Sequence, residues 1–94
     1  MQLIEIFEVR TSQNSKLLLE KYLKQIIKEP QNESKNLGVK LYQRMDLELD
    51  FSVHIIISSD EQHLENSKLG YRIASALKEF GIVYHSAWIE KGID

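Results

Sequence analysis

The stretch that most constrains the fold is Phe51 to Ile57, which reads FSVHIII. Its residues are mostly β-branched or aromatic, and acidic or turn-forming residues flank it, so the pattern favours a strand over a helix. Successive side chains of a strand point to opposite faces. One face is wholly apolar and holds Phe51, Val53, Ile55 and Ile57, and the other is mixed and holds Ser52, His54, Ile56 and Ser58. We expect helices to cover the apolar face and the mixed face to line a cleft or an interface.

Three further segments alternate as strands do. In residues 3–9, expected to be a central strand, Leu3, Glu5, Phe7 and Val9 share one face. In residues 39–45, Lys40, Tyr42 and Arg44 share one face. In residues 82–89, the two faces hold Ile82, Tyr84, Ser86 and Trp88, and Val83, His85, Ala87 and Ile89. We expect both faces of this last strand to be buried, and the period alone leaves open which of them meets the helices.

Two segments have helical periodicity. The first has an apolar stripe of Leu19, Tyr22, Leu23, Ile26 and Ile27. Leu17 and Leu18 are expected to widen this stripe, and Pro30 is expected to end the helix. The second helix is expected to begin at a cap on Asp60 or Ser67, and its stripe is Leu69, Ile73, Ala76, Leu77 and Phe80. Gly81 stands where a left-handed residue commonly ends a helix.

Composition limits what such a chain does. Its 94 residues, 43% of them hydrophobic, suffice for one two-layer core, so we expect a single domain over residues 1–94. The formal net charge of -2 argues against nucleic-acid or membrane partners. The absence of cysteine excludes disulfides and thiolate chemistry. The N-terminal run MQLIEIFEVR has charged residues among its apolar ones, which is not typical of a signal peptide or a membrane span. The expected location is therefore cytoplasmic.

The order of these elements is strand, helix, strand, strand, helix, strand. For a compact domain this order predicts an α+β, ferredoxin-like split βαβ fold. We expect a four-stranded antiparallel sheet with its first and third strands in the middle and both helices on one face. The uncovered face is then expected to carry Phe7, Val9, Tyr42, His54, Ile56 and one set from the last strand. Such a patch exceeds what monomers usually expose, so a homodimer with its sheets face to face is expected.

A resemblance to a known family rests on this ordering, on the length and on one long run of sequence. The run is LGVKLYQRMDLELDFSVHIIISSDEQHLENSKLGYRIASALKEFGIVYHSAWIEKG. It resembles the dimeric α/β barrel superfamily, and most closely its antibiotic biosynthesis monooxygenase-like group. The similarity covers nearly the whole chain and is one of elements and spacing. The Asn, Trp and His set of the haem-degrading members is not recognisable, and IIISSDE stands where members often place a Trp.

The resemblance implies that two paired sheets enclose a lumen that holds a small hydrophobic or aromatic ligand. Members with demonstrated chemistry oxidise electron-rich aromatic substrates with dioxygen, without a metal or an organic cofactor. Other members cleave haem, and many have no known activity. For this chain the expected function is therefore that of a cofactor-independent monooxygenase, an oxidoreductase acting on a small aromatic or quinol-like substrate.

The candidate catalytic residues are His54 as base, with Tyr42 and Arg44 positioning the substrate. Lys40 shares the face of these two residues. The candidate ligand contacts are Glu5, Phe7, Ile56, Tyr84, His85 and Trp88. A non-catalytic interpretation places Lys40 and Arg44 in water, Tyr42 in the dimer, and His54 in the interior, bonded to Glu5 or Tyr42. The alternative function is a small-ligand-binding or oligomerisation module.

Metal and RNA binding are disfavoured. Asp46, Glu48 and Asp50 lack the glycine and the distal glutamate of a calcium-binding loop. His54, His63 and His85 lack the short spacing of zinc ligands. An RNA-recognition domain on the same topology would need aromatic-rich central strands and a basic surface. No metal and no cofactor is expected.

Overall fold

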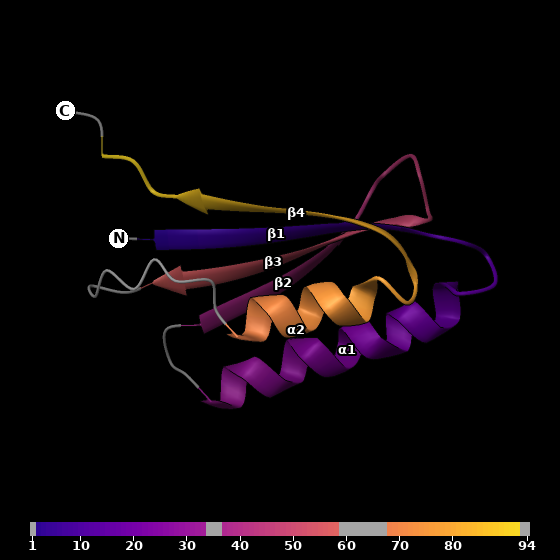
Figure 1. Cartoon of the computed structure of the whole chain (residues 1–94), viewed down its shortest axis with the longest axis horizontal. Coiled ribbons are helices and arrows are strands. Elements are labelled where there is room, and N and C mark those ends of the chain that lie inside the picture. Colours follow the sequence, from indigo (N-terminus) through magenta and orange to yellow (C-terminus); the bar gives the residue numbers. More distant parts are fainter. Residues whose placement is uncertain (1, 34–36, 59–67, 93–94) are drawn as a thin grey trace.

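The computed structural model describes residues 2–33, 37–58 and 68–92. Its elements in chain order are β1 (Gln2–Thr11), α1 (Lys16–Glu33), β2 (Leu37–Gln43), β3 (Asp50–Ser58), α2 (Lys68–Leu77) and β4 (Gly81–Ile89). The strands form one four-stranded antiparallel sheet in the order β2-β3-β1-β4. Both helices lie on one side of this sheet (Figure 1). The predicted ferredoxin-like α+β fold is confirmed, and β1 and β3 are the central strands as expected.

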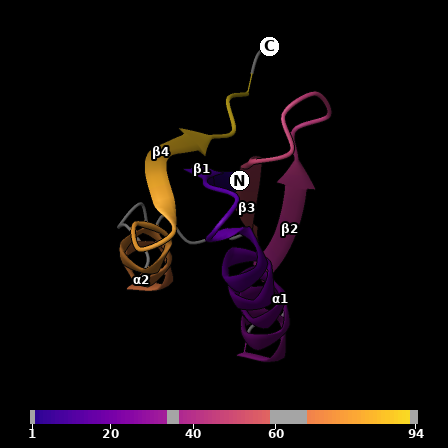
Figure 2. The ribbon, with the colours of Figure 1, turned by 90° about the vertical axis from the view of Figure 1, so that its right-hand side faces the viewer.

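The helices divide the covered face of the sheet between them. Figure 2 shows α1 beneath the β2 side and α2 beneath β4. The described core lies between these layers and consists of Phe7, Val9, Leu19, Leu23, Ile26, Val39, Phe51, Val53, Ile55, Ile73 and Leu77. The predicted apolar face of β3 meets the helices, because Val53 and Ile55 are fully buried and Phe51 is only 6% exposed. Burial of this apolar surface is the main term that stabilises the fold.

The pairing of β1 with β3 decides which residues of β1 reach the core. Phe7 lies opposite Val53, and Val9 lies opposite Phe51. Residues directly opposite each other in an antiparallel pair share a face. Phe7 and Val9 therefore lie beneath the helices, at 0% and 1% exposure. The prediction that they line the open face is wrong, because the alternation of β1 separates two sets without indicating which set points inward.

The predicted stripe of α1 is confirmed at Leu19, Leu23 and Ile26, which are all buried. Leu17 and Leu18, however, are 72% and 60% exposed, so they do not widen that stripe. The helix also continues past Pro30 to Glu33. A proline removes one backbone N–H donor, and here that loss does not end the helix.

In the second half of the chain, Ile73 and Leu77 of α2 are buried as predicted. The predicted caps Asp60 and Ser67 lie outside the described residues. The expectation that β4 is buried on both faces is wrong, because Ile82, Tyr84, Trp88 and Ile89 are all exposed. The reason is that β4 is an edge strand, and that α2 covers only one of its faces.

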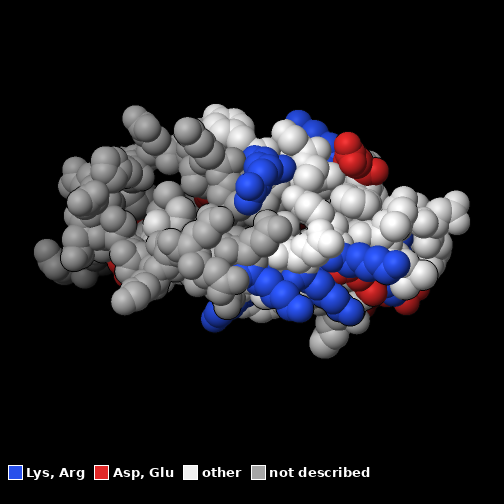
Figure 3. Space-filling model, turned by 90° about the horizontal axis from the view of Figure 1, so that it is seen from below, with Lys and Arg blue, Asp and Glu red and all other residues white. Residues whose placement is uncertain are grey.

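The exposed surface of the helix layer is charged. Figure 3, which views this layer from below, shows Lys and Arg side chains over much of its described part. The exposed basic residues of this layer are Lys21, Lys24, Lys28, Arg72 and Lys78. The helix layer also exposes Leu17, Leu18 and Tyr71. The opposite, open face of the sheet carries the exposed apolar side chains of Tyr42, Ile82, Tyr84 and Trp88.

Position 81 needs a glycine for a reason other than the one predicted from the sequence. No described glycine has a positive φ, so Gly81 is not in the left-handed conformation. It lies opposite Thr11 at the start of β4. A Cβ placed on Gly81 would collide with the backbone carbonyl oxygen of Arg10 and would lie 2.8 Å from its carbonyl carbon. Close approach of two backbones therefore excludes a side chain here.

Replacing Gly81 by Ala should therefore lower the free energy of unfolding by about 2 kcal/mol, because the colliding atoms belong to the backbone and cannot rotate away. Urea unfolding followed by circular dichroism measures this change. Gly92→Ala is the matched control, because a Cβ on Gly92 meets nothing within 4 Å. Equal unfolding midpoints for the two variants would contradict this explanation of Gly81.

Candidate functional site

The open face of the sheet is built from alternate residues of all four strands. The register aligns them across the sheet, from β2 to β4, in three rows: Gly38, Ile56, Ile4 and Trp88; Lys40, His54, Ile6 and Ser86; and Tyr42, Ser52, Glu8 and Tyr84. At the end of the sheet near the β2–β3 loop, Asp50, Arg10 and Ile82 continue the series. The face is therefore apolar at one end, carries a histidine in its middle and is charged at the other end.

His54 lies on this face, as predicted from the alternation of β3. Its Nε2 atom lies 2.7 Å from the Oγ atom of Ser52. Its ring lies against that of Tyr42, with 4.6 Å between the ring centroids. Hence His54 bonds to Ser52 and not to Glu5 or Tyr42. Partial burial lowers the pKa of His54 below its ordinary value, and the nearby carboxylate of Glu8 opposes this effect. The imidazole is thus neutral at pH 7 and able to accept a proton.

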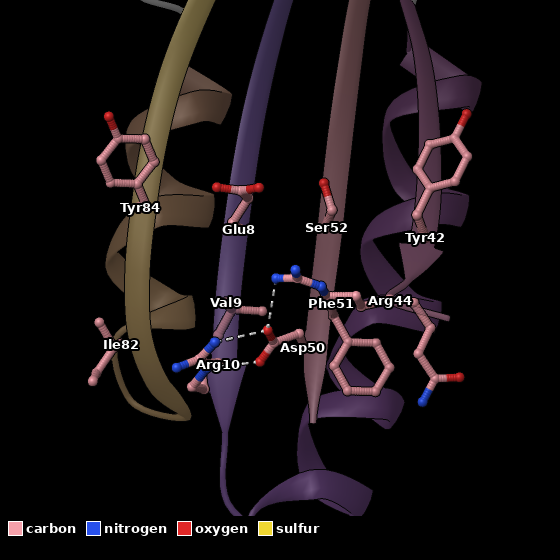
Figure 4. Close-up of a pocket in the computed structure, with 11 residues that line it drawn as sticks. Glu8, Val9, Arg10, Tyr42, Arg44, Asp50, Phe51, Ser52, Ile82 and Tyr84 are labelled. Atoms are coloured by element: carbon pink, nitrogen blue, oxygen red, sulfur yellow. Dashed lines mark hydrogen bonds and ion pairs between the residues drawn. The ribbon is translucent and has the colours of Figure 1, made fainter. Parts of the chain in front are cut away.

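A hollow of about 600 Å³ opens on the same face. His54 does not line it, but Ser52 and Tyr42, the two residues that His54 contacts, do. Its lining includes Glu8, Tyr42, Ser52 and Tyr84, which form one row across the sheet. Figure 4 shows the two tyrosines on the outer strands, with Glu8 and Ser52 between them. The hollow thus has aromatic walls at both sides and a polar floor, which suits a small molecule that lies flat on the sheet.

Ion pairs close the charged end of this hollow. Arg10 donates two hydrogen bonds to Asp50, from Nε at 2.9 Å and from Nη2 at 3.1 Å. The pair with Arg10 holds the pKa of Asp50 below its usual range and raises that of Arg10. Arg44 reaches over β3 toward Asp50 (Figure 4), with 3.7 Å from Nη1 to Oδ2, and its Nε lies 3.4 Å from Asp46. Arg44 is thus shared between two carboxylates.

Lys40 is the other basic residue predicted on this face. It lies directly opposite His54 across the β2–β3 pair and is exposed. Within the described part of the chain, it forms no ion pair. Its ammonium group is therefore not engaged by a described carboxylate, whereas the Arg44 guanidinium is.

Glu5, Phe7 and His85 lie on the other side of the sheet. Glu5 is 1% exposed, and its Oε1 lies 3.4 Å from Nε2 of His85. The His85 ring stacks on Phe7 with 4.2 Å between centroids and an interplanar angle of 10°. A Cβ on Gly70 would lie 2.7 Å and 2.9 Å from the Glu5 carboxylate oxygens, so only glycine lets α2 approach this carboxylate.

The prediction that these three residues share a lumen with His54 is therefore wrong. Glu5 pairs opposite Ile55, a buried residue of the helix-facing set, and Phe7 pairs opposite both Val53 and His85. The remaining ligand-contact candidates, Ile56, Tyr84 and Trp88, do lie on the open face. The structure also settles which set of β4 faces outward, because Tyr84 lies opposite Glu8 and Trp88 lies opposite Ile4.

Glu8 and Arg10 were not among the residues singled out from the sequence. Once Glu5, Phe7 and Val9 are known to face the helices, the alternation of β1 places Ile4, Ile6, Glu8 and Arg10 on the open face. Within the described ranges, no group of three or more His, Asp or Glu side chains is arranged to hold a metal ion. His63 lies outside them. Neither α1 nor α2, in its described extent, is both long and apolar enough to cross a membrane.

Comparison with known proteins shows the fold alone. No protein-family model matches this sequence, and no curated protein matches it. Among solved structures, that of Rv0793 from Mycobacterium tuberculosis is similar, with a TM-score of 0.71 and 14% sequence identity. The match covers 99% of this chain and 98% of that one. At this identity the two chains share a ferredoxin-like architecture from end to end.

Proposed function

We propose that this protein is a homodimeric, cofactor-independent monooxygenase of the dimeric α/β barrel type. Two open sheet faces would enclose a site for a small aromatic or quinol-like molecule, with His54 as the base. The observation that carries this proposal is the imidazole of His54, which contacts Ser52 and Tyr42, two residues that line an aromatic hollow.

The case for a dimer rests on the open face. Ile82, Tyr84 and Trp88 are 78%, 67% and 61% exposed there, and Ile4, Ile6 and Ile56 lie beside them in the rows of the sheet. Contiguous apolar surface of this kind marks an interaction site in a soluble protein. A second copy related by a two-fold axis presents the same apolar surface, so the face can cover itself. Covering it would also exclude water from His54.

The base would work through the ring nitrogen that Ser52 does not contact. In the tautomer in which Nε2 donates its hydrogen to Ser52 Oγ, the lone pair of Nδ1 is free to accept a proton from a phenolic hydroxyl or an activated C–H group. Tyr42 would hold the substrate ring against the imidazole. Lys40, opposite His54, would stabilise the negative charge that forms on the substrate oxygen.

The oxidation then needs only dioxygen. The deprotonated substrate transfers one electron to O₂, and the resulting substrate radical and superoxide combine into a peroxide anion, which takes the proton back from His54 and becomes a hydroperoxide. For an activated methylene, His54 then removes the second C–H proton while the O–O bond breaks, and the departing hydroxide takes that proton to leave as water. In sum, CH₂ and O₂ become C=O and H₂O. The site contributes a base, a cation and a dry environment.

A charge placed at Ile56 tests the dimer. Ile56→Asp should make the dimer dissociate and should lower the stability of the assembly by about 2 kcal/mol, because the new carboxylate would be buried without a partner. Sedimentation equilibrium should give twice the 11.0 kDa chain mass for the unmodified protein and a single chain mass for the variant. Leu17→Glu is the control, because Leu17 is 72% exposed on α1. A monomeric unmodified protein would refute the proposed assembly.

Replacing His54 tests the chemistry. His54→Gln should lower the rate of oxygen consumption with a hydroquinone or an anthrone-like substrate by a factor of about 100 or more, because the site loses its base. Sedimentation of the variant should still give a dimer. Lys40→Met should lower the same rate to a smaller extent, since it removes only charge stabilisation. If the unmodified protein binds such aromatics without oxygen uptake above the buffer rate, the protein is a binding module and not an oxygenase.

The lowered pKa of His54 also predicts how stability depends on pH. Below the ordinary value of 6.5 the unfolded chain binds a proton at this position more readily than the folded chain does. Stability should therefore fall as pH decreases from about 6.5 toward the lower pKa of the folded state. Urea midpoints at about pH 7 and about pH 5, at fixed protein concentration, measure this loss. The loss should be smaller in His54→Gln, and an equal loss would contradict the assignment.

A further inference from the structure

The charges around the hollow do not all find partners on this chain. The charged residues that line it are Glu8, Arg10, Arg44 and Asp50. Arg10 is held by Asp50 through two hydrogen bonds, and Arg44 lies between Asp46 and Asp50. Glu8 forms neither a hydrogen bond through its side chain nor an ion pair with any residue in the described part of the chain. Glu8, which is exposed in the single chain, is therefore the lining charge without a hydrogen-bond or ion-pair partner among the described residues.

The surroundings of Glu8 favour a positively charged nitrogen. A carboxylate can only accept hydrogen bonds, and enclosing it between two sheets costs free energy unless a donor or a cation reaches it. Tyr84 lies directly opposite Glu8 on β4. Figure 4 shows Glu8 between Tyr84 and Ser52, and the Arg44 guanidinium joined to Asp50. A carboxylate beside an aromatic ring is the combination that binds an ammonium group, through a charge-assisted hydrogen bond and a cation–π contact.

The position of Glu8 relative to His54 sets the size of the ligand. Glu8 lies opposite Ser52, so His54 is its diagonal neighbour on β3. Such neighbours are about 7–8 Å apart, which one substituted aromatic ring spans. One end of the ligand would then meet Lys40 and His54, where negative charge is favoured, and its other end would meet Glu8, where positive charge is favoured.

From this arrangement we infer that the hollow selects small phenols that carry a protonated amine, and that Glu8 is the residue that determines this selectivity. The inference rests on the proposed function, since it places the phenolic hydroxyl at His54. The ammonium group of the ligand compensates Glu8, and its ring lies between Tyr42 and Tyr84.

Three probes that share a 4-ethylphenol skeleton and differ in the charged group at its end test the inference. Tyramine carries an ammonium group, 4-ethylphenol is neutral, and 3-(4-hydroxyphenyl)propionate is anionic. In calorimetric titrations at neutral pH, the unmodified dimer should bind tyramine about tenfold more tightly than 4-ethylphenol, and the propionate most weakly. Glu8→Gln should abolish the advantage of tyramine, so that tyramine and 4-ethylphenol bind with similar affinity. Glu79→Gln should retain this advantage, because it removes an exposed carboxylate after α2, away from the open face.

The outcomes separate this inference from the proposed function. Equal binding of tyramine and 4-ethylphenol, unaffected by Glu8→Gln, would overturn the role of Glu8 and leave the aromatic site in place. A weaker dimer in Glu8→Gln with unchanged probe preference would also overturn it, since a basic side chain of the second subunit would then be the partner of Glu8. Failure of all three probes to bind would overturn both the inference and the proposed site.

Discussion

The register between β1 and β3 is the constraint on which the rest of this structure depends. It places Phe7 opposite Val53 beneath the helices and Ile6 opposite His54 on the open face. A shift of one residue would exchange the two faces of β1 and bring Glu8 into the core in place of Phe7. The buried set of apolar side chains prevents that shift. The same register therefore stabilises the fold and brings His54, Ser52 and Glu8 together on one surface.

That surface differs chemically from the rest of the molecule. The helix layer presents basic side chains to solvent together with Leu17, Leu18 and Tyr71, whereas the open face presents exposed aromatic and aliphatic side chains around a few polar groups. One end of the face is apolar, and the next row across the sheet holds His54 and Lys40. The row after that holds Glu8 between Tyr42 and Tyr84, and the Arg10–Asp50 pair lies at the other end. This gradient would orient a ligand that carries both a hydroxyl and an amino group. In a dimer it would also place the most apolar surface where water is excluded.

The buried carboxylate of Glu5 has a different role. It lies beneath Gly70 in the first turn of α2 and beside His85. The close contact between Glu5 and Gly70 links the position of α2 to the central strand. A Cβ at position 70 would displace the Glu5 carboxylate. A carboxylate in an apolar strand is a candidate for a ligand site, and for this reason the sequence alone associated Glu5 with His54.

The sequence by itself determined the fold. The alternation in Phe51–Ile57, the helical stripe at Leu19, Leu23 and Ile26, and the order of elements were sufficient for the ferredoxin-like topology, because each pattern reflects local geometry. The same alternation also placed His54 and Tyr42 on a common open face. What the sequence did not determine was which face of β1 and of β4 points inward, since a period of two defines two sets without a direction. Only the tertiary structure decided this, through the hydrogen-bonded register and the side on which the helices cross. It thereby separated Glu5, Phe7 and His85 from His54 and brought Glu8 beside it.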